Sequence, residues 1–133
     1  MRMILVMAAG VALAGCTKPA PLGPQPTEAL GQQLSAAQIR QEIVGNTGTG
    51  HRTSTNSTYS LYVAPDGTLT EKLPTRTENG RWRITDDGLF CMQWPIDMNG
   101  QEVCQTVHKA GVTTQFASPS SVEELIFQAG NKL

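Results

Sequence analysis

The stretch TYSLYVAPDGTLTEKL, residues 58–73, decides the fold. Apolar and polar residues alternate along its first half, and a second short run, 68–73, follows Pro65-Asp66-Gly67. Alternation with a period of two residues is typical of a strand with one buried face, and a Pro-Asp-Gly sequence is typical of a tight turn. The stretch therefore predicts strand 58–64, a partner strand 68–73, and one apolar face formed by Tyr59, Leu61 and Val63.

Turns and short strands continue to the end of the chain. Further turn signals occur at Asn79-Gly80, Asp86-Asp87-Gly88, Asn99-Gly100 and Ala110-Gly111. The runs that follow them are short: 81–84, 89–94, 102–109 and 112–116. Several short strands at a spacing of about ten residues are typical of an antiparallel sandwich or barrel. We therefore expect a mainly β fold, a small antiparallel meander barrel or sandwich that is lipocalin-like in outline.

One short helix is expected before the strands. Ser35 and Gln38 form a capping-box pattern, and Ile39, Ile43 and Val44 follow at helical spacing. The pattern predicts a helix over 35–43.

The closing segment, residues 122–129, has two interpretations. Ser121 and Glu124 match a second capping box, with Gly130 as a helix stop. The apolar run 125–127 suits a closing strand equally well. We favour the strand.

Length and charge limit the class of protein. The chain has 133 residues, enough for one compact domain of ordinary size. Ten Lys and Arg residues nearly balance eleven Asp and Glu residues, and the formal net charge is -1. A nucleic-acid-binding protein usually carries an excess or a stripe of basic residues. The composition therefore argues against nucleic acid as a partner.

The first residues differ from all that follow. Met1-Arg2 supplies one positive charge, and 3–14 is an uninterrupted run of apolar and small residues. This run is shorter than the roughly 20 residues that a membrane-spanning helix needs. A charged start, a short apolar run and small residues at its end are typical of a secretory signal peptide. We assign the signal peptide to residues 1–15.

The apolar run ends in Leu13-Ala14-Gly15-Cys16, which resembles the lipobox of bacterial lipoproteins. The resemblance implies that Cys16 becomes the first residue of the processed chain. It also implies that acyl chains on Cys16, palmitate among them, anchor the protein in a lipid bilayer. Thr17 stands where an aspartate retains many lipoproteins at the inner membrane. The expected location is therefore the outer membrane of a Gram-negative cell envelope, on its periplasmic face or at the cell surface.

Residues 16–34 are interpreted as the lipid anchor and a tether. Four prolines are interleaved there with Ala, Gly and Gln: Pro19, Pro21, Pro24 and Pro26. Such a segment favours neither a helix nor a strand ladder and should be extended and semi-rigid. The folded domain is therefore expected over 35–133.

Cys91 and Cys104 lie in consecutive predicted strands of a chain that we expect to be exported. Exported proteins fold in an oxidising compartment, so we expect a disulfide between them. A two-residue turn at Asn99-Gly100 would not place the cysteines opposite each other; direct pairing needs a connection centred near Asp97-Met98. Pro95 cannot donate to a ladder and supports a wider loop of about five to seven residues.

The remaining reactive residues indicate neither a metal centre nor a catalytic site. His51 and His108 lack metal-ligand spacing, and two of the cysteines are committed to a disulfide. The chain has no Gly-x-Ser-x-Gly elbow and no phosphate-binding glycine pattern. We therefore expect no metal, no cofactor and no enzymatic activity.

Aromatic residues suggest a core and a weaker ligand hypothesis. Trp82 and Ile84 alternate with arginines and are expected in the core. If the barrel encloses a ligand site, Tyr62, Met92 and Trp94 are the candidate lining residues.

An ordered set of short motifs runs through residues 34–133: Gly45-Asn46-Thr47, Tyr62, Asp66-Gly67, Gly80-Arg81-Trp82-Arg83-Ile84, Asp87-Gly88-Leu89-Phe90-Cys91-Met92-Gln93-Trp94, Cys104 and Gly130-Asn131. In this order the motifs resemble a family of small exported proteobacterial domains of unknown function. The resemblance implies an architectural role for the paired cysteines and for the Gly-x-Trp turn. It implies no reaction, cofactor or catalytic residue, because the family has none assigned.

Three functional hypotheses follow. The first is an outer-membrane lipoprotein with a non-catalytic β domain that binds a protein, a glycan or a small ligand in the cell envelope. The second is a structural or assembly subunit of a larger envelope complex. The third, less favoured, is a hydrolase acting on envelope material. A lined cavity inside the barrel would favour a small ligand, whereas a filled core with an apolar surface patch would favour assembly.

Overall fold

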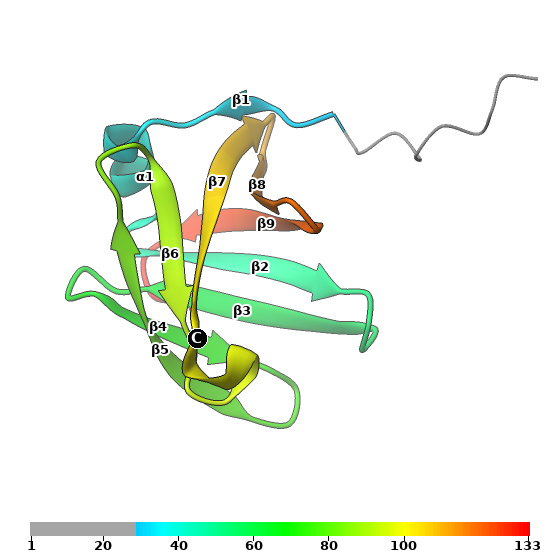
Figure 1. The fold of residues 1–133 in the computed structure, drawn as a ribbon. Helices are drawn as coiled ribbons and strands as arrows, with labels where there is room; N and C mark the ends of the chain where they lie inside the picture. Colours follow the sequence, from blue (N-terminus) through cyan, green and yellow to red (C-terminus); the bar gives the residue numbers. More distant parts are fainter. Residues whose placement is uncertain (1–28) are drawn as a thin grey trace, which may run out of the picture.

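A computed structural model describes residues 29–133 (Figure 1). The elements in chain order are β1 (Gln32–Gln33), α1 (Ala36–Ile43), β2 (Asn46–Arg52), β3 (Ser57–Val63), β4 (Thr68–Lys72), β5 (Thr77–Ile84), β6 (Leu89–Gln93), the short 3-10 helix η1 (Asp97–Gly100), β7 (Glu102–Ala110), β8 (Thr113–Ser118) and β9 (Ser121–Ala129). The predicted signal peptide, the predicted acylation site Cys16 and most of the predicted tether lie outside the described residues. Among the described residues, no helix is long and apolar enough to cross a membrane.

The strands close into an eight-stranded antiparallel meander barrel. Each strand from β2 to β8 pairs with the next strand in the chain, and β9 returns to pair with β2. The barrel prediction is therefore confirmed, and the sandwich alternative is ruled out. Figure 1 shows α1 beside one end of the barrel and the β6–β7 connection at the other end.

The hairpin at residues 58–73 forms as its pattern predicts. Tyr59, Leu61 and Val63 are buried, and Asp66 Oδ1 accepts a hydrogen bond from the backbone N–H of Thr68 at 3.0 Å. Gly67 has a φ of 92°, a left-handed conformation that glycine adopts without a steric penalty. The alternating face and the turn chemistry thus act together to set the register of β3 and β4.

The predicted helix is also confirmed. The backbone N–H of Gln38 donates to the Ser35 hydroxyl, and the Gln38 side chain accepts from the backbone N–H of Ser35. Ile39 and Ile43 are fully buried, so α1 covers one end of the core.

Strand β2 was not predicted, because its glycines and threonines show no alternation of apolar and polar side chains. The structure explains these glycines. A Cβ atom at Gly48 would come within 2.8 Å of the Leu125 and Phe127 side chains, and one at Gly50 would come within 2.8 Å of the Tyr59 hydroxyl. The missing side chains therefore let β9 and Tyr59 pack closely against β2.

Segment 121–129 is a strand, as favoured, and its capping-box pattern is not used. β9 pairs with β8 from Ser121 to Ile126 and with β2 from Leu125 to Ala129. β8 and β2 together pair with β9 along its whole length, so ladder bonds take the place of the internal hydrogen bonds of a helix.

The folded part begins earlier than expected. Residues 31–34 fall within the predicted tether, but Gln32 and Gln33 pair with β7, and Leu34 is buried. β6 pairs with β7 only as far as Thr106, so the rest of that edge of β7 has free backbone groups. The end of the tether binds there, because unpaired strand edges favour added pairing.

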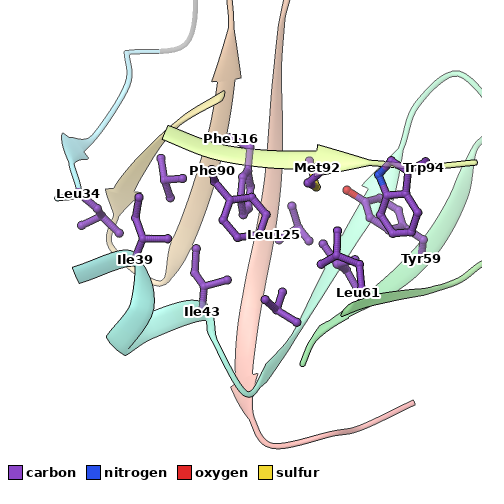
Figure 2. Close-up of a cluster of buried hydrophobic side chains, with 13 residues drawn as sticks. Leu34, Ile39, Ile43, Tyr59, Leu61, Phe90, Met92, Trp94, Phe116 and Leu125 are labelled. Carbon is purple, nitrogen blue, oxygen red and sulfur yellow. The ribbon is translucent and has the colours of Figure 1, made fainter. Parts of the chain in front are cut away.

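Large apolar side chains fill the barrel interior. Phe90 and Phe116 are fully buried in its middle, and their rings meet edge to face with centroids 5.5 Å apart. Figure 2 shows Leu34 and Ile39 at one end of this core and Tyr59 and Trp94 at the other. Trp82 and Ile84 are half-buried and pack against the core, in agreement with the expectation for them.

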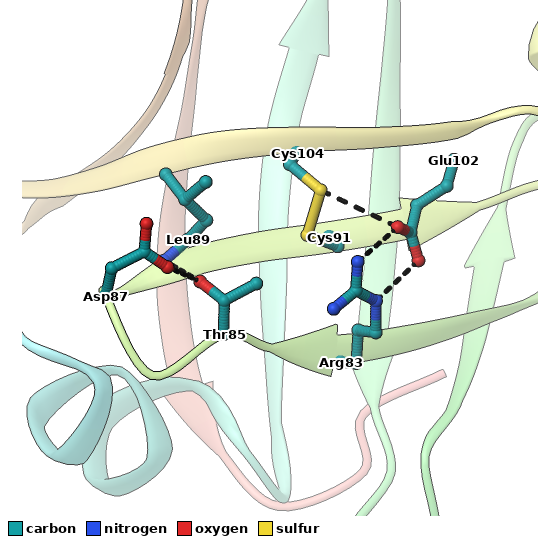
Figure 3. The surroundings of a disulfide bond; sticks show 7 residues. All are labelled: Arg83, Thr85, Asp87, Leu89, Cys91, Glu102 and Cys104. Carbon is teal, nitrogen blue, oxygen red and sulfur yellow. Dashed lines mark hydrogen bonds and ion pairs between the residues drawn. A yellow bond between two sulfur atoms is a disulfide. The ribbon is translucent and has the colours of Figure 1, made fainter.

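The disulfide between Cys91 and Cys104 is present, as expected. The two residues are direct partners on β6 and β7, with Cα atoms 4.0 Å apart. Figure 3 shows the Arg83–Glu102 ion pair beside the disulfide, with Arg83 Nε 2.8 Å from Glu102 Oε2. β6 ends at Gln93 and β7 begins at Glu102, so the loop has eight residues, slightly more than expected, because η1 lies within it.

Candidate functional site

The barrel end opposite α1 carries a small cavity of about 50 Å³. Its apolar wall is formed by Tyr59, Leu61, Met92 and Trp94. Its charged rim is formed by Arg52, Glu71, Asp97 and Glu123. We call this end of the barrel, with these residues, the barrel mouth.

Two glutamates point into the barrel beside the mouth. Glu71 and Glu78 are 4% and 3% exposed, and they are direct cross-strand partners on β4 and β5. Like charges in this position repel each other, so they need counter-charges. Arg52 Nη2 lies 2.9 Å from Glu71 Oε1, and Arg76 Nη2 lies 3.6 Å from Glu78 Oε2.

Asp97 brings a third carboxylate to the same place. Arg76 Nη2 lies 2.8 Å from Asp97 Oδ1, and Arg52 Nη1 lies 3.9 Å from Asp97 Oδ2. We call Glu71, Glu78, Asp97, Arg52 and Arg76 the acid–arginine cluster. Within it, three carboxylates share two guanidinium groups.

Glu78 also fastens the β6–β7 loop to the barrel. Its Oε1 accepts hydrogen bonds from the backbone N–H groups of Ile96 at 2.9 Å and Asp97 at 3.2 Å. The next residues, Met98 and Asn99, have φ values of 61° and 53°, which are unfavourable for residues other than glycine. Local strain of this kind persists only where surrounding contacts fix the backbone, and Glu78 supplies such contacts.

Tyr59 links the mouth to β9. Its hydroxyl donates a hydrogen bond to the Glu123 carboxylate, and the Arg52 guanidinium carbon lies 5.1 Å from the centre of its ring. Burial, together with the nearby Glu123 carboxylate, raises the pKa of Tyr59 far above its ordinary range. The phenol therefore remains a neutral hydrogen-bond donor.

Burial also affects Glu71. It raises the pKa of the Glu71 carboxyl, and the positive charge of Arg52 offsets part of that rise. The free-energy cost of ionising the Glu71 carboxyl thus depends on Arg52 staying in place.

Two of the three predicted ligand-lining residues meet at the mouth. Met92 and Trp94 both line the cavity. Tyr62 does not; it is half-buried on the face of β3 opposite to Tyr59, Leu61 and Val63. Alternation along β3 already assigned Tyr59 to the inner face, and Tyr59 takes the position proposed for Tyr62.

The buried glutamates are not among the predicted site residues, although the sequence carries a signal for them. Glu71 alternates in phase with Leu69, and Glu78 alternates in phase with Gly80 and Trp82. A charged residue in phase with an apolar face predicts a buried charge, and such charges are rare unless they are paired.

The two histidines have different environments. His51 is exposed at the end of β2, whereas His108 is buried. The ring of His108 lies 3.1 Å from the Gly31 carbonyl oxygen through Nδ1 and 2.9 Å from the Thr106 hydroxyl through Nε2. His108 thus helps to hold the N-terminal segment against β7.

A second concave surface lies on the outside of the barrel. The β2–β9 ladder stops at the pair Gly50–Leu125, so His51 and Glu124, next in register, do not pair. A groove of about 650 Å³ opens there. Two exposed apolar side chains of β9 line it, Val122 and Ile126, which are 36% and 50% exposed, beside the buried Leu125. We call this surface the β2–β9 groove.

Comparison with protein-family models, with curated proteins and with solved structures finds no match to this chain. The resemblance to a family of exported domains therefore stays a prediction, and the function has to be inferred from the residues of this chain.

Proposed function

We propose that this protein is a lipoprotein, anchored by acylated Cys16 in the outer membrane, whose β barrel is a non-catalytic module that binds a protein partner on its outer surface. The lipobox sequence and the preceding apolar run support the anchor. The proline-rich tether, which ends on β7 at Gln32, supports a domain held at a short distance from the bilayer.

The observation that carries the binding proposal is the filled barrel. The cavity at its mouth measures about 50 Å³, whereas pockets for small molecules usually measure about 300–1,000 Å³. Phe90 and Phe116 occupy the space in which a lipocalin-like fold would hold a ligand. A partner therefore has to bind on the outside.

The β2–β9 groove is the outer surface best suited to a protein. Val122 and Ile126 are exposed on the same outer face of β9, and Val112 is exposed at the nearby β8 turn. Exposed apolar side chains grouped beside polar ones mark many protein interaction sites. The free strand edges at His51 and Glu124 offer backbone hydrogen bonds beside these apolar side chains.

The same observation supports the second hypothesis, in which the domain is an assembly subunit of a larger envelope complex. The binding hypothesis and the assembly hypothesis differ in whether the partner is bound permanently. If the barrel bound a glycan or a small ligand instead of a protein, the test below would give no protein adduct.

Site-specific photo-crosslinking in intact cells tests the proposal. A photo-reactive amino acid replaces Ile126 in the full-length, lipidated chain, and a matched variant carries it at Lys72, an exposed position on β4. We expect a discrete protein adduct from position 126 and none from position 72. Equal labelling at both positions, or no protein adduct at either, would contradict the proposal.

A further inference from the structure

The acid–arginine cluster has an unbalanced charge. Its three carboxylates face two guanidinium groups, and Arg52 and Arg76 make their shortest contacts, 2.9 Å and 2.8 Å, with Glu71 and Asp97. Glu78 shares its guanidinium group with Asp97, because Arg76 Nη2 lies 3.6 Å from Glu78 Oε2 but 2.8 Å from Asp97 Oδ1. Burying a charge without a close partner is costly, so this position favours a further cation.

A separate feature of Glu78 points to a ligand. Its side chain is almost fully buried, and its Oε2 atom has no hydrogen-bond partner among the described residues. Its other oxygen is saturated by the N–H groups of Ile96 and Asp97. A buried carboxylate oxygen without a hydrogen-bond partner needs an explanation, and a cation bound between it and the two neighbouring carboxylates supplies one.

The spacing of the carboxylates fits a divalent ion. Glu71, Glu78 and Asp97 each offer one oxygen, and these oxygens lie within 4.8 Å of one another. Calcium binds oxygen ligands at about 2.3–2.6 Å, so oxygens on opposite sides of one ion are about 4.6–5.2 Å apart. All three ligands are hard oxygens, which favours Ca²⁺ over zinc or copper. Calcium also tolerates the irregular geometry that Mg²⁺ does not.

We propose that Glu71, Glu78 and Asp97 form a calcium site at the barrel mouth, with water completing the coordination. Arg76 is the competing cation. Its side chain is 43% exposed, so it can move into solvent when the ion binds between Asp97 and Glu78. A site with three carboxylates and a competing arginine belongs in the weak range of about 10⁻⁴–10⁻³ M that is typical of extracellular calcium modules.

The position of the site implies what the ion does. Asp97 belongs to the β6–β7 loop, whereas Glu71 and Glu78 belong to the barrel wall. A bound ion therefore joins the loop to the wall. It also reinforces the two backbone hydrogen bonds by which Glu78 already holds this loop.

Calcium titration of the disulfide-intact protein tests the site, with Tb³⁺ as a luminescent probe excited through Trp94 at the mouth. Three substitutions separate the alternatives. Glu78→Gln keeps an oxygen for the loop N–H groups but removes the ligand charge. Arg76→Gln removes the competing guanidinium. Asp86→Asn, in an exposed turn, changes the net charge by the same amount as Glu78→Gln and is the matched control.

The substitutions at Glu78 and Arg76 should change the calcium affinity in opposite directions. The wild type should bind Ca²⁺ saturably, Glu78→Gln about tenfold or more weakly, and Arg76→Gln more tightly, because affinity follows the charge of the ligand set. Asp86→Asn should bind like the wild type. Because Arg76 is exposed, its variant should fold even if Glu78→Gln does not. The proposal is overturned if neither the wild type nor Arg76→Gln binds Ca²⁺ up to about 10 mM. It is also overturned if Asp86→Asn loses as much affinity as Glu78→Gln.

Discussion

Glu71 and Glu78 lie directly opposite each other on β4 and β5, with both side chains buried in the barrel. Two carboxylates in this position destabilise a sheet unless cations or protons neutralise them. Arg52 lies 2.9 Å from one and Arg76 lies 3.6 Å from the other. The pair therefore links the stability of the barrel mouth to charge and to pH.

This relationship predicts how stability changes with pH. Burial raises the pKa of Glu71 above the value of about 4.3 that an exposed glutamate carboxyl has. The folded state therefore binds a proton more tightly than the unfolded chain, and the stability due to Glu71 falls as the pH rises above that value. Glu71→Gln cannot ionise, so its free energy of unfolding should decrease less over this pH range than that of the wild type.

Chemical denaturation at a series of pH values, in the presence of a chelator, measures the effect. Asp86→Asn is again the control, since Asp86 lies in an exposed turn. An identical pH dependence of stability for Glu71→Gln and the wild type would contradict the interpretation.

The disulfide should be a major part of the stability of this domain. Cys91 and Cys104 are 13 residues apart in the sequence, and closing a loop of this size is worth about 3 kcal/mol in the chain-entropy model. Replacing both cysteines by serine should lower the free energy of unfolding by about that amount. Non-reducing mass spectrometry should show the linked peptides. Two thiols that alkylate without reduction would refute the bond.

Close packing of β2 against β9 depends on Gly48. A Cβ atom there would come within 2.8 Å of the side chains of Leu125, which is buried, and Phe127, which packs against the core. Overpacking of this kind costs about 1–3 kcal/mol, so Gly48→Ala should lower the free energy of unfolding by about that amount. Thr49→Ala, at the adjacent outward position, is the control and should change stability little. Equal effects of the two substitutions would show that the close approach is not what requires glycine.

The proposed lipid anchor depends on a single side chain, Cys16. Cys16→Ser should abolish incorporation of labelled palmitate and release the protein from the membrane fraction, because serine offers no thiol for acylation. Met7→Leu, in the apolar run, is a conservative control that should leave both properties unchanged. Continued palmitate incorporation in Cys16→Ser would disprove lipidation at this residue.

Local signals in the sequence predict local parts of the fold. The β3–β4 hairpin follows from alternation around Pro65-Asp66-Gly67, and α1 follows from the capping box at Ser35. The Cys91–Cys104 register follows from the position of Pro95 and the width of the loop. In each case, the residues that carry the signal make the contacts themselves.

Long-range parts of the structure could not be predicted in this way. β2 is a strand because β9 and Tyr59 pack against the space left by its glycines. The β9 residues that impose this requirement lie more than seventy residues further along the chain. Residues 31–34 pair with β7 only because β6 leaves part of that edge free. Barrel closure sets both contacts, and neither leaves a pattern in the segment itself.

The candidate site was only partly foreseen, for a similar reason. Met92 and Trp94 share an apolar face of one strand, so the sequence identifies both as candidate lining residues. Both line the cavity at the mouth. Glu71 and Glu78 come together because β4 and β5 pair in one register, and Asp97 joins them from a loop. Three acidic residues in three different elements give no recognisable spacing.

The central claim, that a protein partner binds the β2–β9 groove, is tested most directly by combining a crosslinking probe with a charge in the groove. A photo-reactive amino acid at Thr49, an exposed groove position, reports adduct formation in intact cells. Ile126→Glu places a charge among the apolar groove side chains. Ile96→Glu makes the same change at an exposed apolar residue of the β6–β7 loop.

We predict that Ile126→Glu reduces the adduct at position 49 by about tenfold or more, equivalent to about 1.4 kcal/mol of binding, while Ile96→Glu leaves it unchanged. Both variants should keep the melting temperature of the wild type, because both side chains are exposed. An adduct that persists in Ile126→Glu, or one lost only in Ile96→Glu, would contradict binding at this groove.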